Sequence, residues 1–176
     1  MPNYVTLEQL EQVGTIIGER IAASRDSSDG SSVHALIQLR NTDTTTQLNN
    51  SSWTTVPIGG IVDIHDAAAF DIVNTHSVRC KFDGRVKCHV NLSQTTSNVR
   101  TQTSVRLTKN GNQFSGVGMS SYIRSASGHN ESSSDATGYV DVLVNDVISV
   151  QSTQQANNGV IVQVAGASLF SVERVL

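Results

Sequence analysis

The sequence predicts a mainly β protein in which an antiparallel β-sandwich follows an N-terminal helical arm. Short runs rich in apolar and β-branched residues, separated by turn residues, fill the chain from Trp53 onward. Apolar residues recur at helical spacing only near the start of the chain. The length of 176 residues suits one compact domain, alone or with an arm, and is sufficient to bury a core.

The first predicted element is a helix over residues 6–23. Thr6 and Gln9 have the spacing of a capping box. Two glycines inside the helix each cost about 1 kcal/mol relative to alanine, so the isolated helix would be marginal in water. The helix therefore needs a surface to pack on, which is either its own domain or a partner. Its apolar stripe includes Leu10, Val13, Ile17 and Ile21.

A polar segment follows the helix and sets the predicted division of the chain. Residues 24–32 are rich in serine, aspartate and glycine, as is typical of a flexible linker. Residues 33–39 are predicted to form a strand, and the polar tract up to residue 50 a loop or an extended arm. We therefore expect a helical arm at 1–23, a linker and extended arm at 24–50, and a β-sandwich head at 51–176.

The head contains regularly spaced strand candidates. Good turn residues, such as Asp83-Gly84 and Asn110-Gly111, separate several of them. Many short strands of this kind, with helix only at the start of the chain, indicate an antiparallel sandwich. The candidates are 53–58, 69–73, 77–82, 85–92, 101–108, 114–124, 139–144, 147–151, 160–165 and 169–175.

Both cysteines of the chain flank the Asp83-Gly84 turn. Strand alternation places Cys80 in one apolar row and Cys88 in another, and a hairpin centred on Gly84 would pair the two rows. On this prediction the cysteines are core-facing neighbours on adjacent strands, and His89 points away from them. Two reduced thiols acting as small apolar groups are then favoured over a disulfide or a metal site, since the disulfide torsion is hard to reach between adjacent strands.

Charge and hydropathy argue against two classes of partner. The net charge is -3 with only 12 lysine and arginine residues, so the chain lacks the basic surface that nucleic-acid binding requires. No apolar run approaches the roughly 20 residues that cross a bilayer, and the N-terminus does not resemble a signal peptide. We expect synthesis in a cytoplasm, with neither nucleic acid nor membrane as a partner.

The sequence also gives no positive sign of catalysis. It contains no nucleophile-elbow pattern and no phosphate-binding glycine loop. His65 lies between Asp63 and Asp66, an arrangement that suits a cation or a general base but is more typical of a solvated turn. The interpretation is therefore a protein without enzymatic activity, cofactor or metal, and an enzyme remains the least favoured alternative.

Four segments of the head together carry a family resemblance. From Trp53 onward the chain resembles the tumour-necrosis-factor-like jelly rolls, which include complement globular-head domains and many bacteriophage structural proteins. Val86, Cys88 and Asn145-Asp146 depart from that pattern, which has aromatic residues at the first two places and Gly-Asp at the third. The resembling segments are 83–86, 105–111, 142–148 and 168–176.

The resemblance implies a jelly-roll head that forms a homotrimer, with the C-terminal strand near the three-fold axis. It further implies a virion protein, made in the host cytoplasm, that serves as a capsid decoration or cement protein or as a head fibre. Residues 1–50 would then bind the major capsid protein or another virion component. Leu10, Val13, Ile17 and Ile21 are the expected capsid-anchoring or oligomer-contact residues.

A second hypothesis is a host-receptor or carbohydrate-binding module of a phage tail or fibre. Polar segments at 125–134 and 151–158 are predicted loops that would present asparagine and serine to a host glycan. Tyr122, His129 and Asn130 form the candidate ligand-facing loop. The chain has one tryptophan and three tyrosines, which is a poor supply of the aromatic side chains on which sugars stack.

Overall fold

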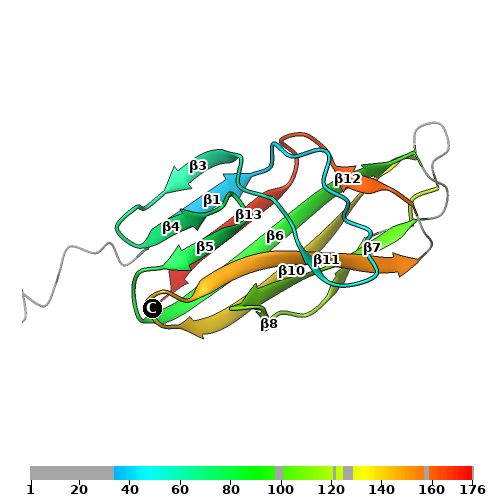
Figure 1. Cartoon of the computed structure of the whole chain (residues 1–176). Helices are drawn as coiled ribbons and strands as arrows, with labels where there is room; N and C mark the ends of the chain where they lie inside the picture. The colour runs from blue at the N-terminus through cyan, green and yellow to red at the C-terminus, as the bar shows by residue number, and fades with distance from the viewer. Residues whose placement is uncertain (1–33, 98–100, 121, 125–128, 157–158, 176) are drawn as a thin grey trace, which may run out of the picture. The chain divides into compact units, whose positions relative to one another are not determined.

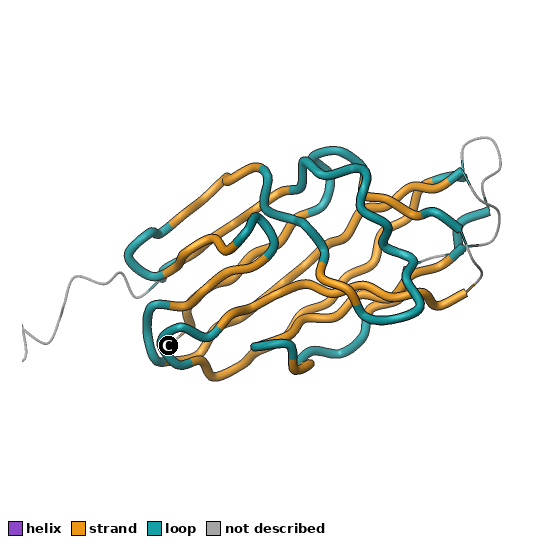
Figure 2. The backbone as a smooth tube through the Cα atoms, viewed as in Figure 1, coloured by secondary structure: helices purple, strands orange, loops and turns teal. Residues whose placement is uncertain are grey.

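The structure, a computed structural model, describes residues 34–97, 101–120, 122–124, 129–156 and 159–175. These residues form two antiparallel sheets that pack face to face (Figure 1). The tube view shows strands joined by loops throughout this part of the chain (Figure 2). The predicted antiparallel jelly-roll sandwich is confirmed. The predicted helix at 6–23 lies outside the described residues.

The first sheet contains the N-terminal and C-terminal strands of the described chain. Its strand order is β10-β6-β13-β1-β3, and β12 also pairs with β6. The long strand β6 thus lies between β10 on one side and β13 and β12 on the other. The bounds are β1 Leu36–Arg40, β3 Ile61–His65, β6 Gly84–Thr96, β10 Glu131–Val142, β12 Ile161–Gln163 and β13 Leu169–Val175.

The second sheet has the order β4-β5-β11-β7-β8, with β2 paired to β11 and β9 paired to β7. The chain crosses between the two sheets repeatedly, for example from β1 to β2, from β5 to β6 and from β10 to β11, as in a jelly roll. The bounds are β2 Thr54–Thr55, β4 Phe70–Val73, β5 Ser77–Cys80, β7 Gln102–Lys109, β8 Asn112–Gln113, β9 Gly118–Met119 and β11 Val147–Ala156.

The core lies between the sheets and follows the alternation of the strands. In β6 every second residue from Val86 to Thr96 is buried, while the residues between them face the other side of the sheet. Phe70 and Phe170 are the largest fully buried side chains, and the rest of the core is mostly aliphatic. No helix of the described chain is long and apolar enough to cross a membrane.

The predicted hairpin at Asp83-Gly84 is wrong. β5 pairs with β4 and β11, whereas β6 pairs with β10, β12 and β13, so the turn carries the chain from one sheet to the other. Cys80 and Cys88 are therefore on facing sheets rather than on adjacent strands. The sequence pattern did not distinguish the two arrangements because both bury the same two apolar rows against each other.

The predicted boundary at residue 50 is too late for the residues that the structure describes. β1 is paired on both edges inside the first sheet, and Leu48 is fully buried. The Leu48 amide donates to the Ile161 carbonyl at 2.8 Å, which fixes this loop on the sandwich. Residues 34–50 thus belong to the head, because their few apolar side chains fill its core. The predicted helical arm at 1–23 and residues 24–33 of the predicted linker lie outside the described residues.

Several predicted strands differ from the observed ones in extent. The segment around His65 was predicted as a turn, but it forms β3, and the turn follows at Asp66. The predicted strand 114–124 is mostly irregular, with only β9 and an isolated bridge at Ile123. The predicted loops 125–134 and 151–158 are largely strand where they are described, because β10 begins at Glu131 and β11 continues to Ala156.

Candidate functional site

The outer face of the first sheet carries a shallow polar hollow. Strand pairing sets His89 directly opposite Thr137 on one side and Ser171 on the other, with Lys87 opposite Glu173 in the neighbouring row. These five side chains line a hollow of about 310 Å³, and His89 Nδ1 lies 2.9 Å from Thr137 Oγ1. The hollow contains both charge signs, so it suits a polar protein surface better than a single ion.

A group of exposed apolar side chains lies where the two sheets meet. We call Val117, Met119 and Tyr139 the β9–β10 edge; their exposed fractions are 46%, 61% and 58%. β9 pairs with β7 of the second sheet, and β10 is the terminal strand of the first. Tyr139 is directly opposite Lys87, so its side chain lies on the outer face of the first sheet beside the polar hollow. Exposed large apolar side chains on two neighbouring strands are candidates for a protein contact.

Gly118 allows β9 to pass close to β10. A Cβ atom at this position would lie 1.7 Å from the carbonyl oxygen of Asp135 on β10, which is inside any permitted contact distance. Gly138 on β10 is packed in the same way, because its Cβ would lie 3.0 Å from the Phe114 ring. The position of β9 beside β10 is therefore set by a close backbone approach at Gly118, whereas Gly138 leaves room for the Phe114 side chain.

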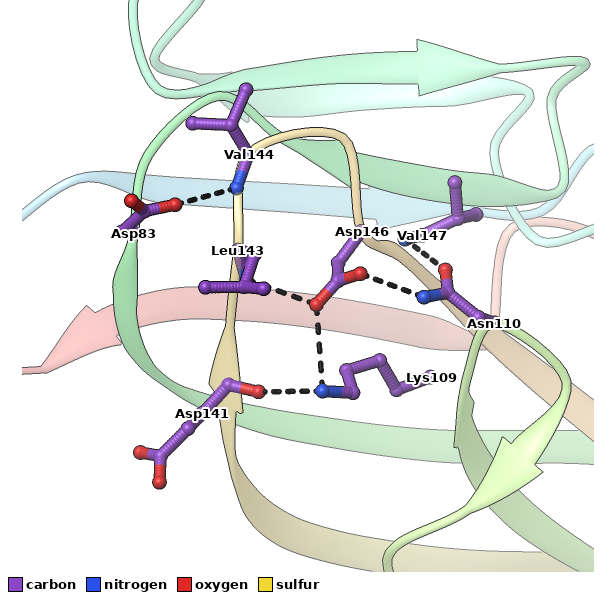
Figure 3. A network of polar contacts seen from close by, with 8 residues as sticks. All are labelled: Asp83, Lys109, Asn110, Asp141, Leu143, Val144, Asp146 and Val147. Carbon is purple, nitrogen blue, oxygen red and sulfur yellow. Dashed lines mark hydrogen bonds and ion pairs between the residues drawn. The ribbon is translucent and has the colours of Figure 1, made fainter.

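A network of polar contacts joins three turns at the end of the sandwich where β6 begins (Figure 3). Asp146 accepts hydrogen bonds from the Leu143 amide at 2.9 Å and from Asn110 Nδ2 at 2.6 Å, and its carboxylate lies 3.4 Å from Lys109 Nζ. The Val147 amide donates to Asn110 Oδ1, and the Val144 amide donates to Asp83.

Both electrostatics and backbone conformation stabilise this network. The Leu143 amide, followed by Asn110 and Lys109, holds the pKa of Asp146 below its usual value. Asn110 and Asn145 have φ angles of 50° and 75°, a left-handed conformation that asparagine tolerates better than most residues. This end of the head is therefore rigidly held, and it presents the exposed side chain of Leu143 at its tip.

The two cysteines lie in the core and are free thiols. Both side chains are fully buried. Burial raises the pKa of Cys80 to about 12, with the nearby Asp146 adding to the effect, and burial also raises the pKa of Cys88. Neither sulfur is therefore a thiolate near neutral pH, which excludes both as nucleophiles in the folded state.

Thiol reactivity gives a direct check of this arrangement. We expect the folded chain to resist the soluble thiol reagent DTNB at about pH 8, because only the exposed thiolate reacts. Both thiols should react once urea has unfolded the chain. Rapid labelling of the folded chain would show that Cys80 or Cys88 is accessible, which contradicts the buried positions.

The predicted ligand-facing residues lie near one another in sequence but differ in their contacts. Tyr122 and His129 are exposed. Asn130 is also exposed, but its carbonyl accepts hydrogen bonds from the Thr96 amide at 3.0 Å and from Thr95 Oγ1 at 3.1 Å. Asn130 thus holds the start of β10 on the end of β6, which leaves Tyr122 as the exposed aromatic of this group.

The single tryptophan is engaged within the chain. The guanidinium of Arg106 lies 4.1 Å from the centre of the Trp53 ring, and Gln151 accepts two hydrogen bonds from the same guanidinium. This stacking occupies one face of the indole. Trp53 is therefore a weak candidate for stacking on a sugar ring.

The sequence reasoning missed the β9–β10 edge and the polar hollow. Val117 and Met119 lay in a segment predicted as a continuous strand, so their exposure was not expected. Leu10, Val13, Ile17 and Ile21 lie outside the described residues. Among the residues that the structure describes, no three histidine, cysteine, aspartate or glutamate side chains meet in a way that suits a metal ion.

The fold is that of known tumour-necrosis-factor proteins. The chain is similar to the crystal structure of murine APRIL, with a TM-score of 0.57 and 14% identity over 81% of this chain and 99% of that one. It is also similar to Eiger TNF from S. frugiperda, with a TM-score of 0.56 and 10% identity over 81% and 93% of the two chains. At these identities the likeness shows the fold alone. No protein-family model and no curated protein sequence matches the chain.

Proposed function

We propose that the chain is a non-enzymatic virion structural protein, a trimeric capsid decoration, cement or head-fibre protein that projects a TNF-like jelly-roll head. The β9–β10 edge, with exposed Met119 and Tyr139, is the observation that carries the proposal. Exposure of large apolar side chains on two neighbouring strands is explained by contact with another protein. The virion setting rests on the sequence resemblance to bacteriophage structural proteins.

The arrangement of surfaces favours a ring of identical subunits. The polar hollow around His89 lies on the outer face of the first sheet, and Tyr139 adjoins it because Tyr139 is directly opposite Lys87. Val117 and Met119 lie at β9, which belongs to the second sheet. Two different patches on one chain allow a head-to-tail contact, which closes into a ring when the rotation permits. The edge of one subunit would cover the outer face of the next, with β13 of each subunit near the three-fold axis.

The anchor of the proposed protein precedes the sandwich. Residues 34–50 are part of the head, so the segment that binds the capsid lies before residue 34. It contains the apolar stripe with Leu10, Val13, Ile17 and Ile21. A trimer carries three such segments, and three linked weak contacts bind far more tightly than one.

Charge substitutions in this stripe test the proposal. We expect the full chain with Val13→Asp and Ile17→Asp to remain folded. It should no longer join virus particles produced from the genome that encodes it, because the stripe can no longer bury apolar surface. Co-sedimentation with gradient-purified particles measures this. The matched control carries Gln12→Asp and Thr15→Asp, which lie off the stripe and should leave co-sedimentation unchanged. Equal incorporation of both variants would contradict the proposal.

A second candidate is a host-recognition module that binds a glycan. The exposure of Tyr122 and of His129 favours this candidate. The full chain on a glycan array should then give a signal that Tyr122→Ala removes, because the sugar would lose its stacking partner. Absence of any signal from the intact chain would leave the structural role as the one supported.

A further inference from the structure

One end of the core is polar, in contrast to the aliphatic remainder. In the first sheet, strand pairing aligns Ser132 of β10, Gln94 of β6 and Gln163 of β12 in one row. Gln94 and Gln163 are 0% and 1% exposed, so their side chains lie between the sheets. Thr101 and Thr103, at the start of β7, are also fully buried. Polar side chains thus replace apolar ones at the end where β6 finishes.

The hydrogen bonds of this cluster leave a matched pair of atoms without a partner. Thr103 donates its hydroxyl to Gln94 Oε1, and Gln163 Nε2 donates to the Pro57 carbonyl at 2.8 Å. Gln94 Nε2 and Gln163 Oε1 are buried and have no protein partner. The hydroxyl oxygens of Thr101, Ser132 and Ser134 are also buried and have no protein partner.

Five buried polar atoms without partners would be costly in one small region. A buried polar group that is left without a hydrogen bond destabilises the folded state, and folded proteins contain only a few of them. Gln94 and Gln163 are directly opposite in an antiparallel pair, where Cβ atoms lie about 4.5–5.5 Å apart. The two amide groups therefore extend from paired positions of one row into the core, so one small molecule could bond to both.

We propose that this polar end of the core, lined by Gln94, Gln163, Ser132, Ser134 and Thr101, is a buried binding site for water. One water molecule accepts a hydrogen bond from Gln94 Nε2 and donates one to Gln163 Oε1. If the Gln94 side-chain amide is turned by 180°, its nitrogen can donate a hydrogen bond to the Thr103 hydroxyl. The water then donates to the side-chain oxygens of Gln94 and Gln163. A bridging water satisfies both amides in either orientation.

The chemistry of the lining selects a neutral ligand. The five residues are two amides and three alcohols, and none of them carries a charge. An ion would lose its hydration without a balancing charge, whereas water matches both donors and acceptors. The site lies at the same end of the sandwich as two further contacts. There the Thr96 amide donates to the Asn130 carbonyl, and Thr101 pairs with Ile123. Bound water would thus support the end that bears Tyr122.

Water oxygen-17 relaxation dispersion on the full chain tests the inference, because it detects waters that stay bound for longer than the protein takes to tumble. We expect a dispersion from the wild type that is reduced in the double variant Gln94→Met, Gln163→Met. Val172→Ala, which removes methyl groups from the aliphatic part of the core, is the control and should leave the dispersion unchanged, since small apolar cavities stay dry.

A dispersion that is absent from the wild type, or that is the same in the double variant, would overturn the proposal. A high-resolution crystal structure of the wild-type chain decides the matter independently if the double variant does not fold. Density for a water within about 3.2 Å of both amide atoms supports the site. A direct bond between Gln94 Nε2 and Gln163 Oε1, or density for an ion, overturns it.

Discussion

Replacing Gly118 with alanine is expected to lower the free energy of unfolding by about 3 kcal/mol, the upper part of the range for overpacked sites. The added Cβ would lie 1.7 Å from the Asp135 carbonyl oxygen, which belongs to the backbone and cannot turn aside. β9 and β10 would have to separate, and the pairing of β9 with β7 would weaken. Urea unfolding followed by circular dichroism measures the loss.

A matched control lies two residues away. Nothing lies within 4 Å of a Cβ built on Gly116, so Gly116→Ala should change the free energy of unfolding by no more than about 0.5 kcal/mol. Similar behaviour of the two variants would mean that β9 does not run close to β10. The position of Met119 on the proposed subunit contact would then lose its support.

Asp146→Asn is expected to lower the free energy of unfolding at neutral pH by about 2 kcal/mol, because a charged acceptor contributes about 1.5–3 kcal/mol. The carboxylate accepts hydrogen bonds from the Leu143 amide and from Asn110, and it forms an ion pair with Lys109. An asparagine keeps the shape but has one acceptor oxygen and no charge. Urea unfolding at about pH 7 checks this loss.

The same variant makes a signed prediction for pH. The folded-state pKa of Asp146 lies below the usual 3.8, so its contribution is present above that value and is lost as the pH falls through the folded pKa. The difference between wild type and Asp146→Asn should therefore shrink below about pH 4. Asp71→Asn, at an exposed ion pair with Lys81, is the control and should cost less than about 1 kcal/mol. A difference that persists unchanged in acid would contradict the electrostatic account.

The sequence predicted the fold class because the strands have a strong two-residue period. Val86, Cys88, Val90 and Leu92 alternate with polar residues, and all four lie in the core of the sandwich. The turns at Asn110 and Asn145 were also visible in the sequence, because asparagine tolerates the left-handed conformation found there. Local patterns of this kind determine which residues face the core.

Which strands pair could not be predicted from the same patterns. The rows containing Cys80 and Cys88 fit a hairpin and a crossing between facing sheets equally well, and the choice depends on distant strands such as β11 and β13. β3 was missed because it is exposed on both faces and so has no apolar alternation. Strand pairing over long sequence separations is a property of the whole sandwich.

The candidate site depends on such distant pairings. Met119 and Tyr139 lie on different strands, which belong to different sheets and approach each other at Gly118. The buried glutamines could not be predicted either, because glutamine is mostly exposed in proteins and the burial of Gln94 and Gln163 depends on the facing sheet. In contrast, the aliphatic stripe at residues 10–21 is a local pattern, and its role in anchoring stays a prediction.

The solution mass of the full chain, measured by light scattering, tests the central claim that the head is a self-associating jelly roll. The proposal predicts a particle of three chains, that is, three times 18.8 kDa. A particle with the mass of one chain, 18.8 kDa, at the concentrations used for assembly would contradict it.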